Sequence, residues 1–293
     1  MRVLILGGDG MLGHQLVRTL RERHEVRATF RAGPARPDAA PLAPEARYPG
    51  VDVRQPEAVL AALADFQPEA VVNAVGLVKQ RPEAKEALAA LQINAVFPHQ
   101  LALLCRAARA RVIHLSTDCV FSGRKGRYTE QDPPDAEDLY GRSKLLGEVS
   151  DQDHVLTLRT SMIGLEVARR TSLVEWFLAQ PGAVRGFTGA IFSGLTTFEL
   201  ARLIDRLLQR HPDLHGLWHV AAAPISKYDL LRQLAAALGR SEVRVEPSGD
   251  LVCDRSLDGE AFRRRTGYEA PPWEAMLREL AEEVRRRAPE VPL

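Results

Sequence analysis

Short apolar runs alternate with longer amphipathic segments over the first 160 residues of the chain. A short run of consecutive apolar residues is typical of a strand buried on both faces, whereas apolar positions three and four residues apart are typical of a helix. The pattern predicts strands at about 2–6, 25–30, 47–53, 70–73, 111–116 and 154–159. It predicts helices at about 11–23, 55–65, 84–109 and 138–150. Such alternation indicates an α/β fold with a doubly wound parallel sheet.

The strict alternation fades after about residue 161. Helices at about 172–180, 197–209, 227–238 and 273–287, and one further strand at 217–220, are predicted in this half. The proline- and alanine-rich segment 33–49 is expected to be a loop after the second strand.

A glycine-rich turn follows the first predicted strand, with glycines at Gly7, Gly10 and Gly13. Gly7 permits a tight turn, Gly10 lets the backbone approach a pyrophosphate, and Gly13 lets the next helix pack closely on the strand. The pyrophosphate would lie on the amides of the helix start, around Met11 and Leu12. The spacing is G-x-x-G-x-x-G rather than G-x-G-x-x-G, so an ordinary glycine loop is the alternative.

Tyr140 and Lys144 are one helical turn apart and therefore share a helix face. An ammonium beside a phenol stabilises the phenolate, which lowers the tyrosine pKa from its usual value of about 10. We expect this pair to make Tyr140 a proton donor near neutral pH. Taken alone, the spacing is more often that of two surface residues.

Polar or small residues follow two further predicted strands. Ser116 and Thr117 end the apolar run 112–115, and Asn73 ends the run 70–72. Ligands of open α/β sheets bind beyond the carboxyl ends of the strands, so these residues are expected to face a cofactor. The alternative for Thr117 is that it only shapes a turn. The cofactor-lining residues predicted here are Asn73, Ala74, Val75, Gly76 and Ser116.

These segments together resemble the extended short-chain dehydrogenase/reductases of the dTDP-4-dehydrorhamnose reductase type. The resemblance is carried by Gly7–Gly13, Asn73–Gly76, Ser116–Gly123, Gly126–Glu130, Leu139–Glu148 and Arg159–Ser161. It implies a dinucleotide-binding Rossmann domain over residues 1–160. It also implies a smaller, mainly substrate-binding lobe over residues 161–293, of which a segment at about 196–220 packs back on the first domain.

The resemblance implies NADPH-dependent reduction of the 4-keto group of a nucleotide-diphospho-6-deoxy-4-ketohexose, for deoxysugar or surface polysaccharide biosynthesis. Tyr140 would give a proton to the alkoxide that forms. Lys144 would lower the tyrosine pKa and bind the nicotinamide ribose, and Thr117 would hydrogen-bond the carbonyl oxygen or orient Tyr140. The expected catalytic residues are thus Thr117, Tyr140 and Lys144, and the last two are also expected to contact the cofactor.

The substrate site is the least defined part of this prediction. Where the rhamnose-forming enzymes carry an aromatic pair, the chain has Met162–Gly164, and it has Cys119 where a tyrosine is common. Trp176 would stack on the base or the sugar, or would belong to the core. Arg255 would bind the diphosphate or form a structural ion pair. The predicted substrate-binding residues are Lys79, Asp118, Cys119, Val120, Phe121, Trp176 and Arg255.

The end of the second strand bears on the choice of cofactor. Acidic residues there usually take the ribose 2′-hydroxyl of NAD, and basic residues accommodate the 2′-phosphate of NADP. The strand ends at Arg31, so NADP(H) is favoured over NAD(H). An exposed loop arginine is the alternative. By similarity to such proteins, Asp52 and Val53 would lie near the adenine; an ordinary strand-end aspartate is the alternative.

Composition adds few constraints. The 293 residues carry a net charge of +1, so no nucleic-acid partner is indicated. Cys105, Cys119 and Cys253 show neither metal-ligand spacing nor a disulfide framework, which is typical of a reducing cytoplasm. We expect no apolar stretch to approach the ~18 residues that span a bilayer. We therefore expect a cytoplasmic protein without a membrane partner or a metal site.

Two other functions stay open. A related epimerase or dehydratase would hold its nicotinamide tightly and consume no cofactor; dehydratases commonly carry a glutamate where this chain has Cys119. The resembling family also includes the non-catalytic regulatory subunit of methionine adenosyltransferase. That branch tends to lose parts of the catalytic set, whereas Thr117, Tyr140 and Lys144 are all present. A homodimer is expected by analogy alone.

Overall fold

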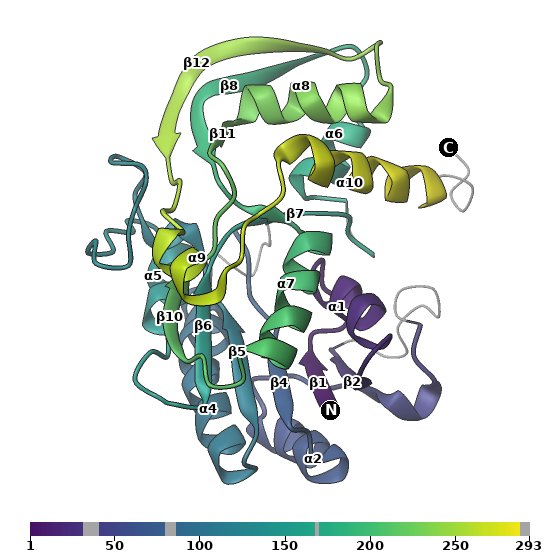
Figure 1. Cartoon of the computed structure of the whole chain (residues 1–293), viewed down its shortest axis with the longest axis vertical. Coiled ribbons are helices and arrows are strands. Elements are labelled where there is room, and N and C mark those ends of the chain that lie inside the picture. Colours follow the sequence, from purple (N-terminus) through teal and green to yellow (C-terminus); the bar gives the residue numbers. More distant parts are fainter. Residues whose placement is uncertain (32–40, 80–85, 168–169, 288–293) are drawn as a thin grey trace. The chain divides into compact units, whose positions relative to one another are not determined.

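A computed structural model describes residues 1–31, 41–79, 86–167 and 170–287. Among these, seven strands form the main sheet, in the order β10-β6-β5-β4-β1-β2-β3 (Figure 1). The strands are β1 (Arg2–Leu6), β2 (Glu25–Phe30), β3 (Arg47–Pro49), β4 (Ala70–Asn73), β5 (Arg111–Leu115), β6 (Val155–Arg159) and β10 (Gly216–His219). Neighbouring strands from β6 to β3 run parallel. The predicted doubly wound parallel sheet is confirmed.

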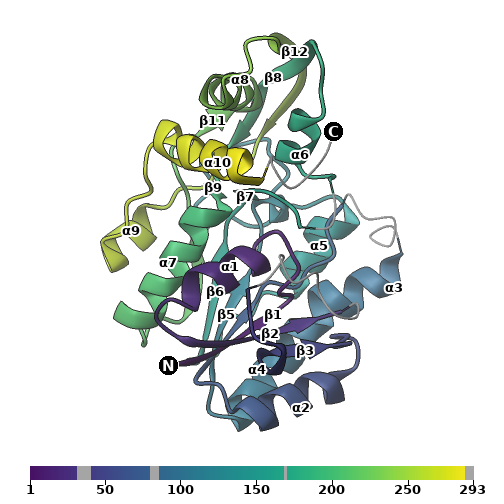
Figure 2. The same cartoon turned by 90° about the vertical axis from the view of Figure 1, so that its right-hand side faces the viewer.

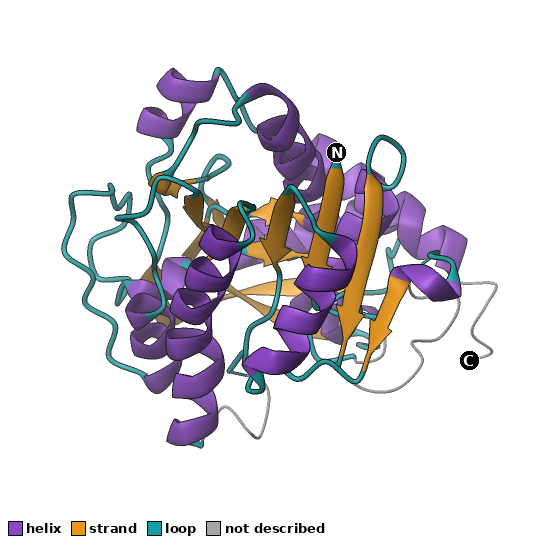
Figure 3. Ribbon diagram, turned by 90° about the horizontal axis from the view of Figure 1, so that it is seen from below, coloured by secondary structure: helices purple, strands orange, loops and turns teal. Residues whose placement is uncertain are grey.

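Helices cover both faces of this sheet, with α1 and α7 on one side and α2 and α4 on the other (Figures 2 and 3). The helices are α1 (Gly13–Leu20), α2 (Pro56–Phe66), α3 (Ala87–Ala90), a π-helical segment (Leu91–Val96), α4 (Phe97–Ala107), α5 (Leu139–Leu146) and α7 (Thr197–Arg210). Leu4 and Leu6 of β1 are buried in a core with Phe66 of α2 and Leu101 of α4. Fully buried apolar strands of this kind explain the continuous apolar runs in the sequence.

The chain divides into two compact units. The first comprises Met1–Val120, Pro134–Arg159 and Ala201–Trp218, and the second comprises Phe121–Pro133, Thr160–Leu200 and the chain from His219 onward. Each unit is therefore assembled from several separate stretches of the sequence.

The second unit is built on a sheet in the order β11-β8-β12 and a small parallel pair, β7 with β9. Its elements are β7 (Met162–Ile163), α6 (Leu173–Leu178), β8 (Ala183–Phe192), β9 (Leu195–Thr196), β11 (Ile225–Ser226), α8 (Lys227–Leu238), β12 (Arg244–Asp254), α9 (Glu260–Thr266) and α10 (Trp273–Arg287). Figure 1 shows β8 and β12 running side by side next to α8. A Cβ on Gly186 would lie 2.7 Å from the Tyr228 backbone, so this glycine lets α8 approach β8 closely.

Several sequence predictions need correction. The third strand ends at Pro49 rather than at residue 53, because Gly50 has a φ of 72° and turns the chain. The long strands β8 and β12 were not predicted at all. Glycines in β8 and a proline in β12 interrupt the apolar pattern that would have indicated them. Residues 33–40 of the predicted loop 33–49 lie outside the described residues, and its end forms a short 3₁₀ turn, Pro44–Ala46, and β3.

The expectation that no apolar stretch approaches membrane-spanning length is also wrong. The continuous helix Ala87–Ala107 is long and apolar enough to cross a membrane by length and composition alone. Half of its apolar window is buried inside the protein, and Phe97, Leu101 and Cys105 belong to the core against the sheet. Core helices of globular proteins commonly have this composition.

Candidate active site

The glycine turn joins β1 to α1 as a tight loop. Gly7 has a φ of 84°, and its carbonyl accepts the Gly10 amide at 3.0 Å. A Cβ on Gly13 would lie 1.8 Å from the Gly7 carbonyl oxygen, so only glycine lets α1 begin this close to β1. The N-cap residue Leu12 makes no side-chain capping bond. The first amides of α1, around Met11 and Leu12, therefore suit an acceptor from outside the chain, such as a phosphate.

The loop after β4 lies next to this turn. Asn73 accepts the Val75 amide at 3.1 Å, which orients its amide so that the nitrogen donates to His114 at 3.1 Å. A Cβ on Gly7 would lie 3.1 Å from a methyl group of Val75. Ala74 and Val75 thus lie against the glycine turn, and the lining of a cofactor by Asn73–Gly76 stays a prediction.

Thr117, Tyr140 and Lys144 come together beyond the carboxyl end of β5. Lys144 lies one turn after Tyr140 on α5, and its Nζ donates to the Leu115 carbonyl at 2.6 Å. The Thr117 hydroxyl donates to the Asp118 carboxylate at 3.2 Å and accepts the Cys119 amide at 3.1 Å. It is also near enough to Tyr140 to act on the pKa of the phenol. Thr117 therefore lies near Tyr140, and Lys144 lies on the same face of α5 as Tyr140 and is bound to the end of β5.

The spacing of Tyr140 from Lys144 predicts a lowered tyrosine pKa, but the pKa of Tyr140 is raised in the protein. This prediction is therefore wrong. Burial is the largest cause because it disfavours the charged phenolate, and the nearby Cys119 and Asp118 act in the same direction. The hydrogen bond with Thr117 acts against them. The protein by itself therefore does not lower the pKa of Tyr140.

A buried ion pair adjoins Lys144. Glu148 binds Arg159 through contacts of 2.8 and 2.7 Å, and only 6% of each side chain is exposed. Ser116 donates its hydroxyl to Glu148 at 2.6 Å. Burial lowers the pKa of Lys144 to about 8, and the Glu148 carboxylate opposes that shift. Lys144 is consequently a cation whose pKa is not far above neutral pH.

Asn94 is a central residue of this region that the sequence patterns did not single out. It lies in the π-helical segment and is 1% exposed. Its side-chain oxygen accepts the Leu77 amide at 2.8 Å, while its nitrogen donates to the Leu77 carbonyl at 3.0 Å and to the Ser143 hydroxyl at 3.1 Å. Asn94 therefore ties the loop after β4 to α5. An amide among the mostly apolar residues of this helical segment was the available signal.

Two glycines allow α5 to pack closely on its neighbours. A Cβ on Gly141 would lie 2.2 Å from the Cys119 carbonyl oxygen, and one on Gly147 would lie 1.9 Å from that of Asn94. The glycines on either side of Lys144 thus help to place the helix that carries it.

Lys79 and Cys119 lie close to Tyr140. Lys79 pairs with Asp138, the N-cap of α5, at 2.5 Å, and its ammonium is 5.7 Å from the centre of the Tyr140 ring. The half-buried Cys119 is near enough to raise the pKa of the phenol. Val120, in contrast, is fully buried, so its side chain is part of the core.

A charged cluster lies beyond β2 and β3, formed by Arg31 after β2 and by Asp52 and Arg54 after β3. Arg54 binds the Asp52 carboxylate through contacts of 3.0 and 2.5 Å and, as the largest cause, lowers its pKa; the exposed Arg31 acts in the same direction. Val53 is buried in the core, so its side chain does not reach the surface. Arg54 was missed in the sequence because the usual signal concerns the strand end alone.

The predicted substrate residues of the second unit have different surroundings. Arg255 donates to the Phe121 carbonyl at 2.8 Å, and the Phe121 ring is buried and stacked 4.1 Å from that of Tyr128. Trp176 on α6 is 38% exposed, so it is not a core residue. Within the described ranges, no group of three or more metal-binding side chains is found.

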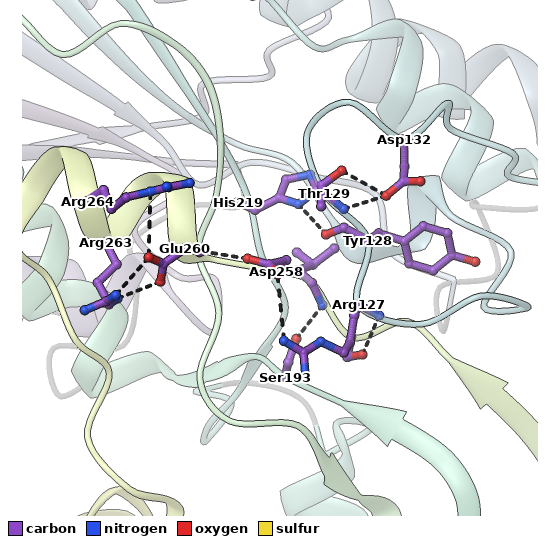
Figure 4. A network of polar contacts seen from close by, with 12 residues as sticks. Arg127, Tyr128, Thr129, Asp132, Ser193, His219, Asp258, Glu260, Arg263 and Arg264 are labelled. Atoms are coloured by element: carbon purple, nitrogen blue, oxygen red, sulfur yellow. Dashed lines mark hydrogen bonds and ion pairs between the residues drawn. The ribbon is translucent and has the colours of Figure 1, made fainter.

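A polar network fixes the segment Gly126–Glu130 within this unit (Figure 4). The Tyr128 carbonyl accepts from His219 at 2.9 Å and from the Asp258 amide at 2.7 Å. Thr129 donates its amide to Asp132 at 2.7 Å. Through these contacts, Tyr128 and Thr129 hold the segment Gly126–Glu130 in place.

The fold and this arrangement of residues define an extended short-chain dehydrogenase/reductase fold. The chain belongs to the RmlD substrate binding domain family, whose sequence pattern matches residues 1–286. The family and fold predicted from the sequence are therefore confirmed.

The relatives of this chain differ in the function that their names give. A protein of Streptomyces antibioticus named "Probable dTDP-4,6-dihydroxy-2-methyloxan-3-one 4-ketoreductase" is 34% identical over 276 residues, 90% of this chain and 83% of that protein. Methionine adenosyltransferase 2 subunit beta of Rattus norvegicus is 35% identical over 151 residues, 50% of this chain and 41% of that protein. The structure of dTDP-4-dehydrorhamnose reductase from Bacillus anthracis in complex with NADP has a TM-score of 0.75 and 20% identity, covering 96% of this chain and 99% of that one.

Proposed function

We propose that the protein is a reductase that uses NADPH to reduce the 4-keto group of a nucleotide-diphospho-6-deoxy-4-ketohexose. The observation that carries this proposal is the placement of Thr117 just beyond β5, with Tyr140 and Lys144 one turn apart on α5 and Lys144 bound to the Leu115 carbonyl. This is the sheet edge that also bears the glycine turn. A proton donor and a pyrophosphate site then lie at the same edge of one sheet, beyond the carboxyl ends of its strands. The 4-ketoreductase of Streptomyces antibioticus, similar over most of its length, supports the substrate class.

NADPH, when bound, supplies a hydride to the carbonyl carbon of the sugar. Tyr140 delivers the matching proton from its Oη to the carbonyl oxygen, so ketone, hydride and proton together give the alcohol. Its raised pKa keeps the phenol protonated at neutral pH, which suits an acid. The Lys144 ammonium and the Thr117 hydroxyl then stabilise the phenolate until the solvent returns a proton.

The charged cluster beyond β2 and β3 supports a preference for NADPH. A 2′-phosphate there meets two guanidinium groups, those of Arg31 and Arg54, around a single carboxylate, Asp52. Because Asp52 is already neutralised by Arg54, it does not repel the phosphate as a free carboxylate would. Charge-assisted bonds of this type contribute ~1.5–3 kcal/mol, or roughly tenfold to hundredfold in affinity.

The test is to follow NADPH absorbance while a panel of nucleotide-linked 4-keto-6-deoxysugars is generated in situ by partner dehydratases. Oxidation with one member supports the reductase and names its substrate. Tight NADP binding without oxidation of NADPH by any member contradicts it and favours the epimerase or dehydratase alternative.

A regulatory subunit is the second candidate, because half of the chain is 35% identical to methionine adenosyltransferase 2 subunit beta. Against it stands the complete Thr117, Tyr140 and Lys144 set, which such a role does not require. Stoichiometric recovery of a methionine adenosyltransferase with the tagged protein, together with no turnover, would favour this candidate.

A further inference from the structure

Glu148 and Lys144 reach the same short stretch of backbone. Lys144 donates to the Leu115 carbonyl at 2.6 Å, and Glu148 accepts the hydroxyl of the next residue, Ser116, also at 2.6 Å. Arg159, at the end of the neighbouring strand β6, holds both oxygens of the Glu148 carboxylate. These contacts fix the carboxylate and prevent it from turning toward solvent.

The surroundings of Lys144 otherwise favour its neutral form. Only 4% of the residue is exposed, and burial favours the uncharged amine. His114 on β5 has a pKa well below its usual range, chiefly through burial, so it brings no charge near neutral pH. Tyr140 is a neutral phenol. Among titratable groups, Glu148 acts on Lys144, and His99 of α4 acts on His114. Tyr140 lies one turn before Lys144 on α5, and Arg159 is bound to Glu148.

We propose that Glu148 is a positioning residue of this site, whose carboxylate, fixed by Arg159 and Ser116, keeps the buried Lys144 protonated. Glu148 acts through Lys144 and not on the substrate. A protonated Lys144 can stabilise a phenolate and donate to ribose hydroxyls, whereas a neutral amine loses the first ability. The benefit to turnover rests on the proposed function, but the protonation of Lys144 does not.

The direct test is the titration of Lys144 by NMR in the full chain. The sequence has five lysines, so lysines labelled with ¹³C and ¹⁵N give few side-chain signals. The Lys144 signal is the one missing from a Lys144→Arg variant. We expect Lys144 to titrate at about 8 in the unmodified protein. In Glu148→Gln its pKa should fall by about one unit or more, because the carboxylate is gone and Arg159 stays as a like charge.

A second variant covers the case in which Glu148→Gln does not fold. The double change Glu148→Gln with Arg159→Met removes both charges, and the Lys144 pKa should still fall below that of the unmodified protein. The control is Asp205→Asn, which alters another mostly buried carboxylate of the first unit, hydrogen-bonded to His24 at 2.7 Å. A Lys144 pKa that stays unchanged in the Glu148 variants, or falls equally in the control, overturns the proposal.

Turnover supplies an independent readout. Lys144 is charged below its pKa, so kcat/KM should fall as pH rises through about 8 in the unmodified protein. In Glu148→Gln this alkaline limb should move to lower pH by the same amount as the NMR titration. If no keto-sugar is reduced, the NMR titration still decides the role of Glu148. If a sugar is reduced and the titration does not move, only the role of Glu148 falls.

Discussion

The two compact units hold their candidate site residues in different ways. In the first unit these residues lie at strand ends and on α5, whose position is fixed by close backbone contacts at Gly141 and Gly147. In the second unit they lie on loops and on the short helix α6, and Trp176 is partly exposed. Residues placed on a rigid scaffold suit chemistry that needs accurate geometry, and residues on loops suit recognition that varies among relatives.

The largest expected effect separates chemistry from binding in the first unit. Tyr140→Phe should lower kcat by roughly 10² to 10⁴, because the proton donor is lost while the ring is kept. NADPH affinity, measured by calorimetry, should stay close to that of the unmodified protein. Unchanged turnover in this variant would remove Tyr140 from the mechanism.

A matched pair of glycine variants tests the rigidity of each unit. Gly13→Ala should lower the free energy of unfolding by about 1–3 kcal/mol or more, since its Cβ would lie 1.8 Å from the Gly7 carbonyl. It should also abolish tight NADPH binding. Gly249→Ala in β12 has no neighbour within 4 Å and should change stability by less than about 0.5 kcal/mol. Equal losses in denaturant unfolding would contradict the contrast between the units.

Cofactor selectivity tests the edge of the first unit. Arg54→Ala removes a cation and leaves the Asp52 carboxylate unpaired near the expected 2′-phosphate, so NADPH affinity should fall about tenfold while NADH affinity changes little. The control is Arg244→Ala in the second unit, an exposed arginine whose partner is Glu246. The affinities for NADPH and NADH would be measured by parallel titrations of each variant. An equal loss of affinity for NADH would contradict a contact between Arg54 and the 2′-phosphate.

The smallest effect concerns recognition in the second unit. Trp176→Ala should cost little stability because the side chain is 38% exposed. We expect a severalfold rise in KM for the sugar nucleotide with kcat nearly unchanged, since stacking contributes equally to substrate and transition state. A large fall in kcat at constant KM would instead place Trp176 with the chemistry.

The same contrast explains how much could be predicted from the sequence. Buried parallel strands such as β1, β4 and β5 are continuous apolar runs, and the glycine turn and the Tyr–Lys spacing are local signals. The strands β8 and β12 carry glycine and proline among alternating exposed and buried positions, so no local signal marked them.

The electrostatics of the site depend on tertiary structure and could not be predicted locally. The Glu148–Arg159–Ser116 cluster joins residues from three separate segments, and its ion pair matters because it is buried. The spacing of Tyr140 and Lys144 indicates that a charge lies near the phenol, but it does not indicate how deeply the phenol is buried. For that reason it predicted a lowered tyrosine pKa where burial raises it.

The most direct test of the central claim is the fate of a labelled hydride. The protein would be given NADPH in which both hydrogens on C4 of the nicotinamide are replaced by deuterium. The second substrate would be the nucleotide-linked 4-keto-6-deoxysugar that supports NADPH oxidation. The account predicts one deuterium at C4 of the product sugar, seen by NMR and mass spectrometry. Deuterium at another carbon, or an unlabelled product, would contradict it.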